Sequence, residues 1–139
     1  MFVDRSIDPT ADQVRALRDA PDDGPVTMVN RLKFRAVARY DDGDAAPCSG
    51  REAYGRYKTA FTETVGAVSR AEVVFQGPLQ QVFIGVAAQP EADWDEVLVV
   101  RYPSRRHFLA MMADPTYREA LRHRYAGLER TVLLQCVAG

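Results

Sequence analysis

An arginine, Arg101, interrupts an otherwise apolar strand pattern in the segment WDEVLVVRYPSRRHF (residues 94–108). It alternates with Val97 and Val99, so a strand directs it to the same face as these valines. A guanidinium on an apolar face needs a carboxylate, either of a ligand or of an Asp or Glu of the protein at a dimer seam. Arg101 is therefore a candidate anion-binding residue. Tyr102 ends the strand on the opposite face, where ligand contact and core or rim packing are both open.

Asn30 is a second polar residue on an apolar face. In the segment VTMVNRLKF (residues 26–34) it alternates with Met28 and Leu32. A buried amide without partners costs about 1–3 kcal/mol. Asn30 is therefore expected to bond either neighbouring backbone, as a structural residue, or a polar ligand.

Three aromatic side chains are further candidates. Tyr54 and Tyr57 lie three residues apart on the inward side of a predicted helix, a spacing that is typical of core packing. Buried hydroxyls still need partners, and two phenols beside Asn30 would suit a polar ligand. Trp94 precedes the apolar strand and is either a packing anchor or a ligand contact.

His107 and His123 are the two histidines of the chain. His107 falls in the first turn of a helix expected after Ser104, where the helix dipole disfavours the imidazolium. Arg122 and Arg124 flank His123 and disfavour its charge as well. Either ring could act as a neutral base, and His123 is the candidate proton carrier of a catalytic step. A surface or hydrogen-bonded role is the alternative for both.

The remaining polar residues give no metal or cofactor signal. Asp41, Asp42 and Asp44 lack the spacing and the closing glutamate of a calcium loop, which favours a solvated turn. Cys48 and Cys136 have neither a CxxC spacing nor nearby histidines, so we expect free thiols rather than a zinc site. No cofactor is expected.

These residues must be positioned by elements that the hydrophobic periodicity predicts. Capping-box spacings at Thr10/Gln13 and Ser49/Glu52 begin two helices, the second running to about Gly66. Two more helices are expected from Ser104 to Ala113 and from the pair Asp114-Pro115 onward, with an inward stripe of Tyr117, Leu121 and Leu128. The predicted strands cover residues 26–34, 71–76, 79–85, 95–102 and 131–138, with a turn at Gly77-Pro78 and a loop over 87–93.

This order of elements predicts an α+β fold. Without the first helix and the short strand over 79–85 it reads βαββαβ, a ferredoxin-like layout whose antiparallel sheet carries helices on one face. Apolar positions on the other face need a cover, and a second copy of the chain is the simplest one. We therefore expect a homodimer.

Composition agrees with one ordinary domain. The chain has 139 residues, of which 47% are hydrophobic, and a net charge of −1. We expect a single domain over residues 1–139, with a helical extension (1–24) and a ferredoxin-like core (25–139). A balanced charge predicts no nucleic-acid or membrane partner, and the absence of a signal-peptide pattern predicts a cytoplasmic protein.

Four segments, in order, resemble the DUF1330 family of the dimeric α/β-barrel superfamily: VNRLKFR, YDDG…SGREAYGRY, WDEVLVVRYPSRRHFLAMMADPTY and HRYAGLE. The resemblance covers about residues 25–138. It implies a ferredoxin-like protomer whose sheet packs against the partner's sheet to close a barrel, with a pocket between sheet and helices. It does not imply one chemistry, because the superfamily includes cofactor-free monooxygenases, lactone isomerases, haem-degrading enzymes and plain ligand binders.

Three hypotheses follow. The first is a homodimeric binder of a small acidic or phenolic metabolite, in its enzymatic form a cofactor-independent monooxygenase- or isomerase-like protein in which Arg101 holds an anion and His123 moves a proton. The second is a haem-degrading enzyme using Asn30, Trp94 and His107, although their spacing departs from that of such enzymes. The third is a non-enzymatic ligand sensor or accessory protein. The candidate ligand-binding residues are Asn30, Tyr54, Tyr57, Trp94, Arg101, Tyr102 and His107.

Overall fold

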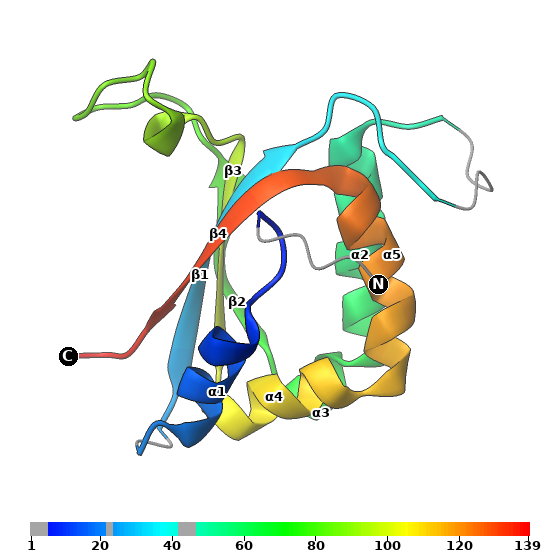
Figure 1. Cartoon of the computed structure of the whole chain (residues 1–139), viewed down its shortest axis with the longest axis vertical. Coiled ribbons are helices and arrows are strands. Elements are labelled where there is room, and N and C mark those ends of the chain that lie inside the picture. The colour runs from blue at the N-terminus through cyan, green and yellow to red at the C-terminus, as the bar shows by residue number, and fades with distance from the viewer. Residues whose placement is uncertain (1–5, 22–23, 42–46) are drawn as a thin grey trace.

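A four-stranded antiparallel sheet with helices on one of its faces forms the body of the protein (Figure 1). The structure is a computed structural model, and it describes residues 6–21, 24–41 and 47–139. The strands follow the order β2-β3-β1-β4. Their bounds are β1 Val26–Phe34, β2 Glu72–Pro78, β3 Glu96–Tyr102 and β4 Leu128–Cys136. This is the predicted ferredoxin-like arrangement.

The α-helices of the described residues are α1 Ala11–Asp19, α2 Gly50–Thr64, α3 Gly66–Ser69, α4 Arg105–Ala113 and α5 Pro115–Gly127. All but α3, which was not predicted, begin at the predicted capping residues. Both capping boxes form, because the side chains of Thr10 and Ser49 each accept from the backbone N–H three residues on. Ser104 caps α4 by accepting from His107 N–H, and Asp114 caps α5 by accepting from Thr116 N–H. No helix in the described part of the chain is long and apolar enough to cross a membrane.

Alternation along the central strands separates two faces of the sheet. On β1, Met28 and Leu32 are buried under the helices, as predicted. The same alternation on β3 buries Leu98 and Val100, whereas Val97 and Val99 on the opposite face are only half-buried. Strand β3 is thus buried on one face alone. The other face, called the open face below, is not covered by any helix of the described residues (Figure 1).

Two expectations between β2 and β3 were wrong. Gly77 and Pro78 are not a turn but the last two residues of β2, an edge strand where the missing N–H of proline costs no ladder hydrogen bond. Residues 79–85 form no strand. The β2–β3 pairing closes where Leu79 N–H donates to Asp95 O at 2.9 Å, and the chain then leaves the sheet. A further strand there would have had no neighbour to bond.

Two glycines allow α2 and α5 to touch backbone to backbone. A Cβ on Gly127 would lie 2.5 Å from Gly50 O and 2.9 Å from Tyr54 N, closer than any real contact. Gly127 O also accepts from Arg35 N–H at 2.8 Å, and Gly50 N–H donates to Arg35 O at 3.0 Å. The start of α2, the end of α5 and the chain after β1 are therefore joined at one point.

We predict that Gly127→Ala destabilises the protein by about 1–3 kcal/mol, because the added methyl overpacks this contact. Gly55→Ala, in the middle of α2, is the matched control, since its Cβ meets nothing within 4 Å. It should instead stabilise by about 0.5–1 kcal/mol through helix propensity. Urea unfolding measures both changes, and equal free energies of unfolding for the two variants would contradict the packing account.

Candidate ligand cavity

A cavity of about 700 Å³ lies between the helix-covered face of the sheet and the helices α1, α2, α4 and α5. Its wall is largely apolar, with side chains such as Met28, Leu17 and Leu121. A small number of polar groups converge on it, among them Asn30 and Arg124. A mostly apolar cavity of this size with a few placed polar groups is typical of small-molecule sites.

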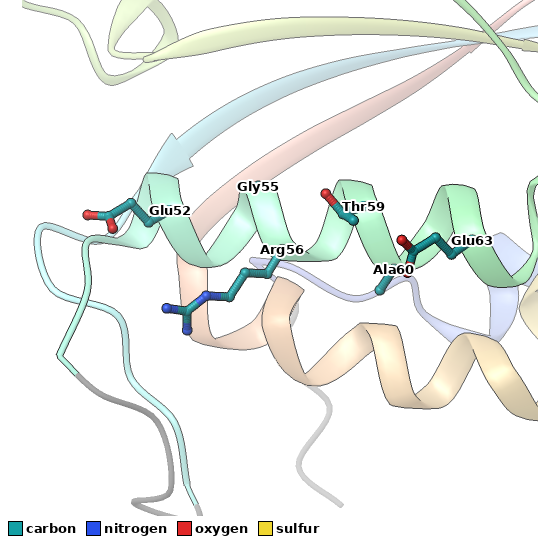
Figure 2. Close-up of a pocket in the computed structure, with 6 residues that line it drawn as sticks. All are labelled: Glu52, Gly55, Arg56, Thr59, Ala60 and Glu63. Carbon is teal, nitrogen blue, oxygen red and sulfur yellow. The ribbon is translucent and has the colours of Figure 1, made fainter.

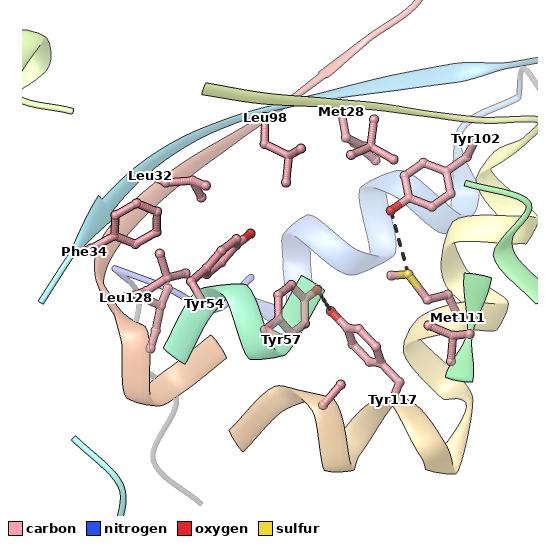
Figure 3. Close-up of a cluster of buried hydrophobic side chains, with 14 of the residues drawn as sticks. Met28, Leu32, Phe34, Tyr54, Tyr57, Leu98, Tyr102, Met111, Tyr117 and Leu128 are labelled. Carbon is pink, nitrogen blue, oxygen red and sulfur yellow. Dashed lines mark hydrogen bonds between the residues drawn. The ribbon is translucent and has the colours of Figure 1, made fainter. Parts of the chain in front are cut away.

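Four tyrosine hydroxyls point into the space between sheet and helices (Figure 3). Helical spacing puts Tyr54 and Tyr57 on the inward side of α2, with ring centroids 5.1 Å apart. Tyr57 and Tyr117, on α5, share a hydroxyl–hydroxyl hydrogen bond of 3.2 Å. Tyr102 donates to Met111 Sδ at 3.8 Å. Burial raises the pKa of Tyr54, Tyr57 and Tyr102, so these phenols stay neutral at physiological pH and can donate hydrogen bonds.

Arg124 is the cation of this cavity. Burial by itself lowers the pKa of Arg124, but the neighbouring tyrosines together raise it by more, and the pKa lies above the ordinary arginine value. These tyrosines are Tyr54, Tyr57, Tyr117 and Tyr125. The guanidinium is therefore charged and largely withdrawn from bulk solvent, its side chain being 15% exposed.

Asp8 is the carboxylate nearest to this cation within the described residues. Its Oδ1 lies 4.0 Å from Arg124 Nη1, the outer limit of an ion pair. The same oxygen accepts a hydrogen bond of 2.8 Å from Tyr125. Burial and this bond raise the pKa of Tyr125 to about 12. A guanidinium has five N–H donors and favours two parallel bonds to a carboxylate, which this distant contact does not provide.

Asn30 lies on the cavity wall, on the face that it shares with Met28 and Leu32, and only the NH₂ half of its amide has a partner within the described residues. Its Nδ2 donates to Leu98 O at 2.9 Å, which supports the structural alternative. No described residue donates to its Oδ1. Asn30 can therefore hold its place in the sheet and still accept a hydrogen bond from a ligand hydroxyl or acid.

Arg101 lies away from this cavity. Its side chain is on the open face, 48% exposed, and its Nη2 donates to Glu72 on β2 at 2.8 Å. Arg101 thus pairs with a carboxylate of its own chain and does not line this cavity. Tyr102, one residue on, is buried on the cavity side.

The histidines and Trp94 are not brought to the cavity with Asn30. His107 Nδ1 lies 2.7 Å from Ser104 Oγ at the start of α4. His123 Nδ1 lies 2.7 Å from the hydroxyl of Tyr40, on the outer side of α5. Trp94 donates to Glu91 O at 2.7 Å, beyond the end of the sheet. Each has a partner that a structural role explains.

The other expected features have separate outcomes. Cys48 and Cys136 are both free thiols, as predicted. Of the three aspartates expected in a solvated turn, Asp41 is exposed, while Asp42 and Asp44 lie outside the described residues. A second hollow runs along α2 beside side chains at helical spacing (Figure 2). It is a shallow surface depression whose charged side chains are exposed, so it does not enclose a ligand.

Sequence reasoning missed Arg124, Asp8 and Tyr125. For Arg124 a signal was present, since it lies seven residues after Tyr117 and three after Leu121, on the inward stripe of α5. Like Arg101, Arg124 is an arginine among apolar neighbours and therefore needs an anion. Asp8 and Tyr125 carry no such signal, because their contact joins residues 117 positions apart.

The fold and cavity together define a ferredoxin-like α+β protein with an internal site large enough for a small molecule. The chain belongs to the family described as domain of unknown function DUF1330, whose model matches residues 47–137. No curated protein matches the chain.

Solved structures agree with this assignment. A protein of unknown function from Rhodopseudomonas palustris, RPA0582, is 34% identical over 94% of each chain, with a TM-score of 0.82. A second structure, of methylated RPA0582, is 35% identical over 95% of this chain and 93% of that one, with a TM-score of 0.80. A dimeric protein of unknown function and ferredoxin-like fold from Bacteroides fragilis is 13% identical over 83% and 97%, with a TM-score of 0.52. This last likeness concerns the fold alone.

We predict non-additive effects of removing the two bonded hydroxyls. Tyr57→Phe and Tyr117→Phe should each destabilise by about 1 kcal/mol, because each leaves the other buried hydroxyl without its partner. The double variant should cost less than the sum of the two. Thermal or urea unfolding of the four proteins gives the coupling energy, and simple additivity would show that the hydroxyls do not depend on one another.

Proposed function

We propose that this protein is a homodimeric small-molecule binder whose cavity holds a small organic acid with an aromatic or phenolic body. The observation that carries the proposal is Arg124, a charged and mostly buried guanidinium on the wall of a largely apolar cavity. Withdrawing such a cation from water is costly unless an anion compensates it. A ligand carboxylate on Arg124 would supply two charge-assisted hydrogen bonds.

The rest of the wall supports an aromatic body for this ligand. Neutral phenols on α2 and α5 present hydrogen-bond donors and ring edges, and Asn30 Oδ1 presents an acceptor. Apolar side chains such as Met28 and Leu121 cover the remaining surface. A ring with a carboxylate at one end and a hydroxyl at the other would engage all three kinds of group.

A cofactor-independent reaction on this ligand is the enzymatic form of the proposal. Asp8 lines the cavity and, within the described residues, is its carboxylate, so it replaces His123 as the candidate proton acceptor. A ligand sensor or accessory protein would use the same cavity without turnover. Haem degradation gains no support, because Asn30, Trp94 and His107 lie apart and only Asn30 lines the cavity.

The homodimer rests on the open face of the sheet. Val29, Val99 and Phe75 are neighbours across β1, β3 and β2, and Phe75 is 56% exposed. The Arg101–Glu72 pair borders this apolar strip. An apolar strip rimmed by charges on an uncovered sheet is the pattern of an interface between copies.

We predict that 4-hydroxybenzoate binds more tightly than its neutral amide, 4-hydroxybenzamide, by about tenfold or more. Arg124→Met should remove this preference, because it deletes the cation while keeping the apolar stem. Arg101→Met is the matched control, since Arg101 lies on the other face, and it should keep the preference. Isothermal titration calorimetry measures all six affinities.

A preference that survives in Arg124→Met would overturn the role of Arg124. If the preference for 4-hydroxybenzoate were lost in Arg101→Met instead, the anion-binding site would lie on the open face. Native mass spectrometry of gently purified protein complements this experiment, because a reproducible extra mass on the intact assembly identifies a ligand retained from the cell.

We predict that Phe75→Lys shifts the protein from dimer to monomer, because it places a charge in the centre of the proposed interface. Val68→Lys, at a comparably exposed valine on α3, should leave the dimer intact. Sedimentation velocity measures the mass of both. A monomeric parent protein would refute the homodimer, whatever the variants do.

A further inference from the structure

The segment between β2 and β3, residues 79–95 and called the arm below, projects away from the body of the protein. It leaves the sheet on the side opposite the large helices (Figure 1). Its tip carries Phe83 and Ile84, which are 85% and 89% exposed, and Val86 is exposed beside them. Gly85 has φ +131°, a conformation that glycine adopts without strain and that turns the chain at the tip. Large apolar side chains in contiguous exposed positions mark an interaction surface.

The base of the arm is fixed to the sheet. Asp95 donates its N–H to Leu32 O at 2.8 Å and accepts from Phe34 N–H at 2.9 Å. Asp93 forms ion pairs of 3.0 Å with Lys33 on β1 and with Arg130 on β4. These contacts fix the base so that the arm projects from the body of the protein and does not fold back to bury its apolar tip. A surface that covers the tip must therefore come from outside the chain.

The composition of the arm restricts that partner. Residues 79–95 contain no lysine or arginine and carry three acidic groups, Glu91, Asp93 and Asp95. Lys33 and Arg130 pair with Asp93 and Asp95 at the base, and residues 79–90, which include the tip, carry no charged side chain. The tip therefore offers no electrostatic attraction to an anionic membrane or a nucleic acid, and a protein surface with apolar positions is the partner that it fits best.

The open face supplies a reason for that protein to be a second copy. Four strands spaced by about 4.8 Å, with seven to nine residues each rising about 3.3 Å, present a plane of roughly 500 Å². A stable interface buries about 800 Å² on each partner. The sheet alone therefore falls short, and the arm, which extends from the same side, offers apolar surface next to it.

We infer that the arm is a dimer clasp, whose Phe83–Ile84 tip packs against the partner copy beyond the edge of the two facing sheets. In an isologous dimer each arm reaches the other protomer, so the two tips contribute symmetrically. This inference rests on the proposed homodimer and goes beyond it, because it assigns dimer stability to a segment outside the sheet.

Site-specific photo-crosslinking tests the contact. The photoreactive residue p-benzoylphenylalanine in place of Phe83 should give covalent dimers on illumination of the purified protein. The same residue in place of Val68, on α3, should give none. Dimers from position 68 but not from position 83 would place the interface on the helical side and overturn the inference.

Making the tip of the arm polar tests whether the tip contributes to the stability of the dimer. The double variant F83S/I84S should raise the dimer dissociation constant by about tenfold or more, with V68S as the control. A dimeric parent with an unchanged constant in F83S/I84S would refute the clasp and leave the open-face dimer standing. A monomeric parent would refute both. Co-sedimentation of the parent with phosphatidylcholine vesicles, lost in F83S/I84S, would assign the tip to a membrane and also overturn the clasp.

Discussion

The contact between Gly50 and Gly127 is the constraint on which the interior of this protein depends. It brings the backbones of α2 and α5 together without side chains between them. With the two helices so close, Tyr57 and Tyr117 meet through their hydroxyls across the gap. The same approach surrounds Arg124 with tyrosines. A larger residue at either glycine would separate the helices and with them the polar groups of the cavity.

This arrangement places a charge where burial disfavours it. A cavity that served only to pack the core would not need a cation at position 124, since burying one is costly and Asp8 at 4.0 Å compensates it only weakly. Arg124 nevertheless stays charged, because a guanidinium does not lose its proton inside a protein, and the tyrosines around it stay neutral. Polar groups that oppose stability and converge on a cavity are typical of binding sites, and this is why the function proposed here rests on Arg124.

The sequence predicted the fold well because local signals agree with one another along most of the chain. Thr10, Ser49 and Asp114 begin helices through hydrogen bonds to residues two or three positions on, which spacing alone reveals. The site was harder, because it depends on distant contacts. Alternation grouped Asn30 with Met28 and Leu32 and set Tyr102 on the face opposite to Arg101. It could not tell which face of the sheet the helices cover, and so Arg101 was considered before Arg124. The arm escaped prediction because its residues resemble a strand that has no neighbour to pair with.

A crystal structure of the protein grown with 4-hydroxybenzoate tests the central claim most directly. The account predicts the carboxylate within hydrogen-bond distance of the Arg124 guanidinium, with the ring among the tyrosines of α2 and α5 and Asn30 within reach of a polar group. A ligand bound on the open face beside Arg101, or a cavity closed by side chains that exclude it, would contradict the account.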